Sequence, residues 1–357
     1  MDQLPHRPLR RALLAAAIGA PLGARFGGLP RAATLGGPRM KRPIPGTGES
    51  LCAVGLGTWQ VFDVAGDANA RAQAKEALEA FARNGGELVD SSPMYGSSET
   101  VTGDLAAELA LHRQLFLATK VWTRGREEGV RQMRDSIAKL RSTLKGPLDL
   151  MQVHNLVDTA THLKTLRSWK DEGLVRHLGV SHYHAGAHAD LEKALSAPDI
   201  KFLQVNYSIA EPQAESRLLR VAAERGVAVI INRPFAEGAM FARVRGKPLP
   251  GFAADIGASS WAQLFLKWIL GHPAVTCVIP GTRSATQPLA YQLSRPLATD
   301  SLPRYVLVSN GFTAGGSDYL WTASTVPLNV TVDGAYMVLT PATQLQHGVT
   351  YTVQHAG

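Results

Sequence analysis

Short β-branched segments alternate with amphipathic segments from about residue 50 to residue 284. Strict alternation of this kind predicts a parallel sheet, because each return to a parallel neighbour needs a helical crossover. Eight parallel strands are the number that closes a (β/α)8 TIM barrel, which we predict for residues 40–300. The predicted strands are 53–58, 87–92, 115–121, 148–154, 177–183, 202–208, 228–235 and 276–282. The predicted helices are 71–84, 99–111, 127–144, 159–172, 186–195, 215–226 and 260–271.

The segment 127–144 illustrates the helical pattern. Its apolar residues recur at steps of three and four, which predicts one buried helix face; they are Val130, Met133, Ile137, Leu140 and Leu144. A doubly wound open sheet is the alternative architecture for the same alternation. No G-x-G-x-x-G follows any predicted strand, so the main signal of a Rossmann nucleotide site is missing.

The positive charge is concentrated at the start of the chain. The 357 residues carry a formal net charge of +8, and the pI is 9.6. Residues 1–50 hold eight basic and two acidic residues and so supply +6 of it. The rest of the chain is nearly neutral, so we expect no nucleic-acid partner. The two cysteines, Cys52 and Cys277, exclude a disulfide scaffold and a cysteine-rich zinc site, and we expect both to be buried apolar side chains.

Residues 1–39 have the composition of a leader. The pair Arg10-Arg11 precedes an apolar stretch and small residues near Ala32-Ala33, a pattern that resembles a twin-arginine signal. The stretch is too short and too weak for a membrane-spanning helix, so we expect no stable membrane insertion. We predict a disordered leader and export to the periplasm. The alternative is a disordered basic tail on a cytoplasmic protein.

Residues 301–357 differ in composition from the barrel. They hold three charged residues and alternating runs such as 335–340 and 349–353, which predict a small β-rich C-terminal extension. Residues 330–353 resemble the closing strands of bacterial Ig-like modules. A β-extension that covers the barrel is the alternative.

Four chemically matched residues lie at the ends of consecutive predicted strands. Asp90 ends the second strand, Tyr95 lies on the following loop, Lys120 is near the end of the third and His154 ends the fourth. A barrel brings neighbouring strand ends together, and these groups suit proton delivery to a carbonyl oxygen. The ammonium is expected to lower the pKa of the phenol, and the carboxylate to hold the ammonium in place. The alternative is a structural ion pair among core polar groups.

The same residues belong to a set of short motifs that resembles the aldo-keto reductase family. The resemblance covers roughly residues 40–284. The motifs are GLGTWQ at 55–60, Asp90-Ser91 followed by SPMYG at 92–96, TK at 119–120, QVH at 152–154, GVSHY at 179–183, QVNYS at 204–208 and IPGT at 279–282. The resemblance implies a (β/α)8 barrel that binds NADPH, with NADH possible, and lacks a Rossmann motif. It implies Tyr95 as proton donor, Lys120 and Asp90 as the groups that tune it, and His154 as the group that orients the substrate.

The resemblance also implies a set of cofactor-binding residues. Side chains on the fifth and sixth strands would hold the nicotinamide amide; they are Ser181, His182 and Gln204. Arg233 would reach the pyrophosphate or form a surface ion pair, and Arg283 and Ser284 would bind the 2′-phosphate. Asn232 stands where many members place an aromatic ring on the nicotinamide. Residues 285–292 depart from the family's adenosine-binding helix.

Two functional hypotheses follow. The first is an NADPH-dependent oxidoreductase that reduces a small-molecule aldehyde or ketone to an alcohol, acting as a monomer without a metal. The second is a nucleotide-binding redox sensor or a surface-attached binding module with little turnover. The clustered histidines 182, 184 and 188 lack the H-E-x-x-H pattern of a zinc site, so we expect no metal.

Overall fold

The computed structural model describes residues 39–282, 305–310, 323–333, 336–341 and 350–355. Within the first range lies an eight-stranded parallel sheet in the order β10-β9-β8-β7-β6-β5-β4-β3. Its strands are β3 (Leu56–Gly57), β4 (Leu88–Asp90), β5 (Phe116–Val121), β6 (Leu148–His154), β7 (Val175–Ser181), β8 (Ile200–Asn206), β9 (Ala228–Asn232) and β10 (Val275–Val278). The predicted barrel strands are confirmed.

The first and last strands close the sheet into a barrel. Parallel bridges join Val54 to Val278 and Gly57 to Gly281, and the N–H of Gly57 donates to the carbonyl of Pro280 at 3.0 Å. A Cβ at Gly57 would lie 2.8 Å from the carbonyl oxygen of Ile279, so only glycine permits this approach. The architecture is therefore the predicted TIM barrel and not an open sheet.

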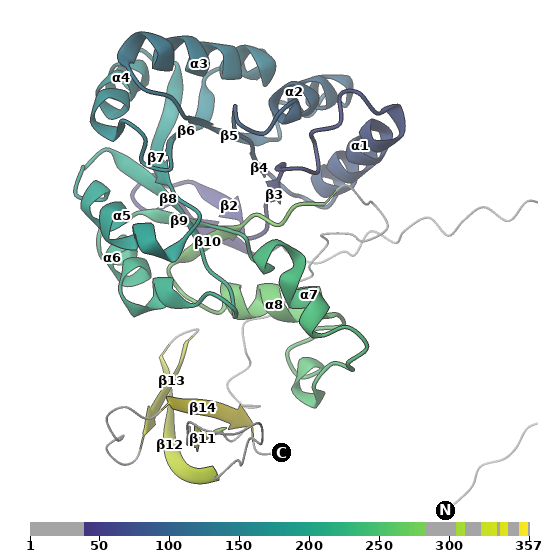
Figure 1. Cartoon of the computed structure of the whole chain (residues 1–357), viewed down its shortest axis with the longest axis vertical. Coiled ribbons are helices and arrows are strands. Elements are labelled where there is room, and N and C mark those ends of the chain that lie inside the picture. Colours follow the sequence, from purple (N-terminus) through teal and green to yellow (C-terminus); the bar gives the residue numbers. More distant parts are fainter. Residues whose placement is uncertain (1–38, 283–304, 311–322, 334–335, 342–349, 356–357) are drawn as a thin grey trace, which may run out of the picture. The chain divides into compact units, whose positions relative to one another are not determined.

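The helices surround the strands, as Figure 1 shows. They are α1 (Ala68–Arg83), α2 (Ser98–Glu108), α3 (Arg126–Lys139), α4 (Thr159–Asp171), α5 (His188–Ala194), α6 (Leu218–Glu224), α7 (Ala239–Arg243) and α8 (Trp261–Leu270). The side chain of Asp67 caps α1 by accepting the N–H groups of Asn69 and Ala70, both at 2.9 Å. Short 3-10 turns flank several helices: η1 (Ser142–Leu144), η2 (Ala185–Ala187), η3 (Gln213–Ser216), η4 (Ala236–Gly238) and η5 (Gly251–Ala253).

One detail of the predicted helix pattern is wrong. Met133 and Leu140 are buried, and Val130 and Ile137 pack partly buried against the core. Leu144 is instead 56% exposed, because α3 ends at Lys139 and the chain turns through η1. The apolar stripe of the sequence therefore runs past the end of the helix.

Two segments have no counterpart in the predicted pattern. A hairpin of β1 (Lys41–Pro43) and β2 (Ser50–Cys52) contributes Ile44 and Leu51 to the buried cluster inside the barrel. In this cluster the two residues lie with side chains near the strand starts, such as Phe116 and Ala228, so the hairpin plugs the amino-terminal end. The second is the stretch from η4 to η5, which lies between β9 and α8. Ala253 of η5 forms a small buried cluster with Leu264 of α8.

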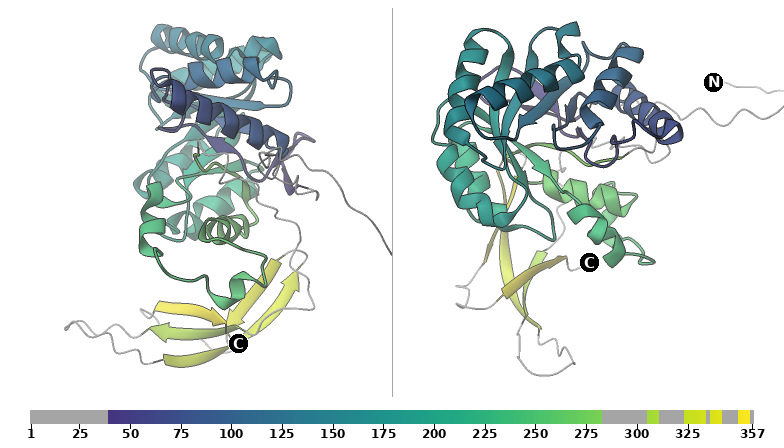
Figure 2. Two further views of the ribbon diagram at one scale, coloured as in Figure 1. Left: turned by 90° about the vertical axis from the view of Figure 1, so that its right-hand side faces the viewer. Right: turned by 45° about the horizontal axis from the view of Figure 1, so that its top comes forward.

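The C-terminal strands form a separate antiparallel sheet in the order β13-β12-β11-β14, drawn in yellow in Figure 2. Its strands are β11 (Tyr305–Asn310), β12 (Ala323–Asp333), β13 (Tyr336–Pro341) and β14 (Thr350–His355). The predicted β-rich extension is confirmed as secondary structure. The leader, residues 1–38, lies outside the described residues. In the part of the chain that is described, no helix is long and apolar enough to cross a membrane.

Behind the barrel wall, Glu99 is a buried carboxyl on the first turn of α2. Its side chain is 1% exposed and accepts a hydrogen bond from Thr119 Oγ1 at 2.5 Å. Burial raises its pKa, although the hydrogen bond from Thr119 opposes the shift.

We expect Glu99→Gln to stabilise the protein at neutral pH more than at pH 4.5. A carboxyl whose pKa is raised by folding binds more protons in the folded state than in the unfolded state. The wild type therefore loses stability as the pH rises from the unfolded-state pKa of about 4.3 through the folded-state pKa. Each unit of difference is worth about 1.4 kcal/mol, and the glutamine variant avoids this loss. Melting temperatures measured from pH 4.5 to 8 test this, with exposed Glu76→Gln as the control. A difference in melting temperature between Glu99→Gln and the wild type that does not grow with pH would contradict the prediction.

Candidate active site

The site lies at the carboxyl ends of the barrel strands. Asp90 and His154 are the last residues of β4 and β6, and Lys120 is the next to last of β5. In the sheet register Lys120 pairs with Gln152, and His154 pairs with Ser181. Because side chains alternate along a strand, residues two apart on β6 point to the same side, which places Gln152 and His154 together inside the barrel.

Lys120 and Asp90 form a buried ion pair. Lys120 Nζ donates to Asp90 Oδ2 at 2.7 Å and to the carbonyl of Ser91 at 2.6 Å. The side chains of Lys120 and Asp90 are 0% and 2% exposed. Burial alone lowers the pKa of Lys120, but Asp90 and Tyr95 outweigh it, and the pKa is raised. The ammonium is therefore charged at neutral pH and fixed in place.

Tyr95 lies against this pair. Lys120 Nζ is 5.0 Å from the centroid of the Tyr95 ring, and that centroid is 6.3 Å from the centroid of His154 in an edge-on arrangement. Burial raises the pKa of Tyr95, and Lys120 lowers it by a smaller amount. The predicted effect of the ammonium is present, but desolvation of the phenolate outweighs it, so Tyr95 is a neutral phenol at pH 7.

His154 is neutral as well. Burial, with a smaller contribution from Lys120, lowers the pKa of His154 to about 2. Its Nδ1 lies 2.8 Å from Ser181 Oγ, so Nε2 is the ring nitrogen left for a ligand. The structure thus brings together all four groups predicted from the sequence.

The residues expected at the nicotinamide lie beside these four. Ser181 contacts His154, and Gln204 Nε2 donates to Asp90 Oδ1 at 2.7 Å. His182 Nδ1 accepts the N–H of Tyr183 at 2.9 Å, and burial lowers the pKa of His182 to about 4. Hydroxyl, imidazole and amide groups therefore gather on the ends of β7 and β8, a set of donors and acceptors that fits a carboxamide.

Asn232 and Arg233, at the end of β9, extend the site. Asn232 Nδ2 donates to the carbonyl of His182 at 3.0 Å, while its Oδ1 is buried without a partner among the described residues. Arg233 donates to the carbonyl of Tyr183 at 3.2 Å and forms ion pairs with Glu237 at 3.4 Å and with Glu211 at 3.9 Å. These contacts hold Arg233 at the end of β9, and its reach to the pyrophosphate stays a prediction. Arg283 and Ser284 lie outside the described residues.

Apolar side chains rim the same end of the barrel. Trp59, Met94 and Trp122 follow β3, β4 and β5 by a few residues and are 44%, 40% and 41% exposed. Exposed apolar side chains gathered around polar groups are typical of a ligand site. This end can therefore receive an apolar molecule that carries one polar reacting group.

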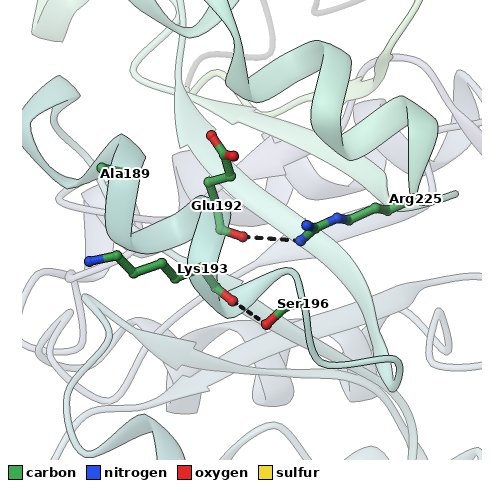
Figure 3. A pocket seen from close by; sticks show the side chains of 5 residues that line it. All are labelled: Ala189, Glu192, Lys193, Ser196 and Arg225. Atoms are coloured by element: carbon green, nitrogen blue, oxygen red, sulfur yellow. Dashed lines mark hydrogen bonds between the residues drawn. The ribbon is translucent and has the colours of Figure 1, made fainter.

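A hollow on the outer wall of the barrel lies apart from this chemistry. Figure 3 shows its lining residues on and beside α5: Ala189, Glu192, Lys193, Ser196 and Arg225. Arg225 donates to the carbonyl of Glu192 at 3.1 Å, and Ser196 Oγ to that of Lys193 at 2.6 Å. Its polar groups are thus already paired within the protein. Among the described residues, no group of three His, Cys, Asp or Glu side chains could hold a metal ion.

Sequence reasoning missed one polar side chain of the site. Gln152 is fully buried and its Nε2 donates to Asp90 Oδ1 at 3.2 Å. Its position could have predicted this. Gln152 lies two residues before His154 on the same strand, so both side chains point to the inner face.

Residues 53–290 match the profile described as Aldo/keto reductase family. Methylglyoxal reductase YeaE of Escherichia coli is 27% identical over 245 residues, covering 64% of this chain and 80% of that protein. An NADH-specific methylglyoxal reductase of the same organism is 25% identical over 241 residues, covering 60% and 72%. The crystal structure of an aldo/keto reductase from Klebsiella pneumoniae in complex with NADP and acetate has a TM-score of 0.61 at 24% identity, covering 72% of this chain and 90% of that one.

Proposed function

Since the chain belongs to the aldo/keto reductase family, we propose that it reduces an aldehyde or ketone to an alcohol with NADPH as hydride donor. The observation that carries the proposal is the buried Lys120–Asp90 pair beneath the neutral phenol of Tyr95. A purely structural ion pair would have no need of a phenol and an imidazole at the same strand ends.

The roles of the side chains follow from their contacts. Tyr95 donates its proton to the carbonyl oxygen as negative charge develops there, and Lys120 stabilises the phenolate that remains. His154, neutral and held by Ser181, directs Nε2 to the same oxygen and orients the substrate. NADPH, when bound, would supply the hydride that forms the alcohol together with the proton of Tyr95.

Ser181, His182 and Gln204 would hold the nicotinamide carboxamide. The buried, unpartnered Oδ1 of Asn232 beside them supports this placement, because a carboxamide N–H₂ would supply the donor that it lacks. A relative named as an NADH-specific reductase supports NADH as a second possible cofactor. Arg283 and Ser284 remain proposed ligands of the 2′-phosphate.

The test is titration with NADPH and then turnover with a panel of aldehydes and ketones, from small polar to large aromatic. We expect NADPH binding and oxidation of NADPH that depends on the carbonyl compound. The exposed Trp59 and Trp122 favour the aromatic end of the panel. Nucleotide binding without oxidation across the panel would contradict the proposal and favour the redox sensor or binding module. Gel filtration of the same sample tests the proposed monomer.

We also propose that the chain is exported through its twin-arginine-like leader. The support is the pair Arg10-Arg11 before an apolar stretch, in a segment that holds most of the net charge. Cell fractionation of the full chain and of an Arg10→Lys, Arg11→Lys variant tests this. We expect the variant to stay in the cytoplasm, and equal periplasmic amounts of both would overturn the proposal.

A further inference from the structure

Gln152 is a buried polar side chain of the site that has no role in the reaction proposed above. It is 0% exposed, and its Nε2 donates to Asp90 Oδ1 at 3.2 Å. Its Oε1 is buried and has no partner among the described residues. A buried amide whose oxygen accepts no hydrogen bond destabilises a core. A leucine or methionine of similar size would leave no polar atom without a partner.

The barrel makes room for this amide at the neighbouring strand. Gln152 pairs with Gly179 of β7 in the register. A Cβ at Gly179 would lie 3.0 Å from Gln152 Cγ and 2.9 Å from the carbonyl oxygen of Phe202. A side chain on residue 179 would therefore press against Gln152, and glycine lets the amide lie against the strand.

Asp90 is held from both sides. Oδ2 accepts the Lys120 ammonium at 2.7 Å, while Oδ1 accepts the amides of Gln152 at 3.2 Å and Gln204 at 2.7 Å. These three donors come from β5, β6 and β8, so the orientation of the carboxylate is fixed across the barrel. N–H groups on Oδ1 also draw negative charge from Oδ2 and so limit how strongly the carboxylate attracts Lys120.

We propose that Gln152 is a positioning residue that acts through Asp90: it orients the carboxylate and moderates its hold on Lys120, so that the ammonium stays close to the phenol of Tyr95. The inference rests on the proposed function of the site. Four further titratable groups interact electrostatically with Asp90 or Lys120: Tyr95, His154, Glu99 of α2 and Cys277 of β10. All four are kept in the Gln152 variants below, and Tyr95 is replaced only in the reference proteins used for subtraction.

The experiment compares the full-length wild type with Gln152→Leu and Gln152→Met. With the amide gone, Lys120 is drawn toward Asp90 and away from the phenol, so the pKa of Tyr95 rises. We expect an upward shift of about half a unit or more, read from tyrosinate absorbance as the difference between each protein and its Tyr95→Phe counterpart. We also expect kcat to fall about tenfold, with the affinity for NADPH, measured by fluorescence titration, within about twofold of wild type.

A control variant removes an amide hydrogen bond elsewhere. Gln114→Met deletes the bond from Gln114 Nε2 to the carbonyl of Ala82 at 2.6 Å, outside the site, and should leave the Tyr95 titration and kcat unchanged. The same shift in this control, or none in either folded Gln152 variant, would overturn the inference. The tyrosinate titration needs no turnover. If the wild type reduces no carbonyl compound, the proposed function fails, while the spectroscopic shift still decides the role of Gln152.

Discussion

Replacement of Tyr95 by phenylalanine should reduce kcat for carbonyl reduction by about 10²–10⁴, which is the usual contribution of a general acid. The variant keeps the aromatic ring beside Lys120 and His154 and removes only the phenolic oxygen. Because that oxygen acts on the substrate, NADPH affinity should stay close to that of wild type. Steady-state kinetics together with NADPH titration check both parts.

The pH dependence of the wild type belongs to the same prediction. The pKa of Tyr95 is raised by burial, so the proton donor is present through neutral pH, and reduction should decline only in the alkaline range. Because the pKa of His154 is about 2, this imidazole should add no acidic limb between pH 5 and 8. More than a tenth of wild-type kcat in Tyr95→Phe would contradict its assignment as the acid.

The second large effect is expected on stability, from Asp149→Ala. Asp149 is fully buried at the start of β6 and accepts Arg176 at 2.6 Å, Lys145 at 2.6 Å and the N–H of Leu117 at 2.8 Å. Its removal leaves the buried N–H of Leu117 without this acceptor and takes one partner from each cation, since Arg176 keeps Glu49 and Lys145 keeps the carbonyl of Leu115. Removing one partner of a buried pair costs about 3–5 kcal/mol, which corresponds to a loss of about 6–20 °C in Tm for a domain of this size.

Calorimetry of Asp149→Ala and Asp190→Ala provides the test. Asp190 is the matched control, since its side chain is 64% exposed and pairs only with Lys193 at 3.1 Å among the described residues. Its loss should change stability by less than about 0.5 kcal/mol. Similar melting temperatures for the two variants would show that the Asp149 cluster does not stabilise the barrel.

The sequence by itself determined the barrel and the place of its chemistry. Alternating strands and helices dictate parallel crossovers, and parallel strands put all their carboxyl ends at one edge. Asp90, Lys120 and His154 end consecutive strands, so their convergence needed no knowledge of packing. These signals are local, since each depends on periodicity and position within one segment.

Only the tertiary structure decided which groups are partners inside the barrel. Gln152 and Gln204 both reach Asp90, although they lie 62 and 114 residues away, and Arg233 donates to the carbonyl of Tyr183, 50 residues away. The hairpin that plugs the barrel and the exposed Leu144 were likewise absent from the predicted pattern. The raised pKa of Tyr95 also could not be predicted from the sequence. The lowering of this pKa by the Lys120 ammonium was expected, but the larger increase caused by burial depends on the folded structure. Hydrogen-bond partners and burial depend on register and on contacts across strands distant in sequence, which the periodicity of one segment does not encode.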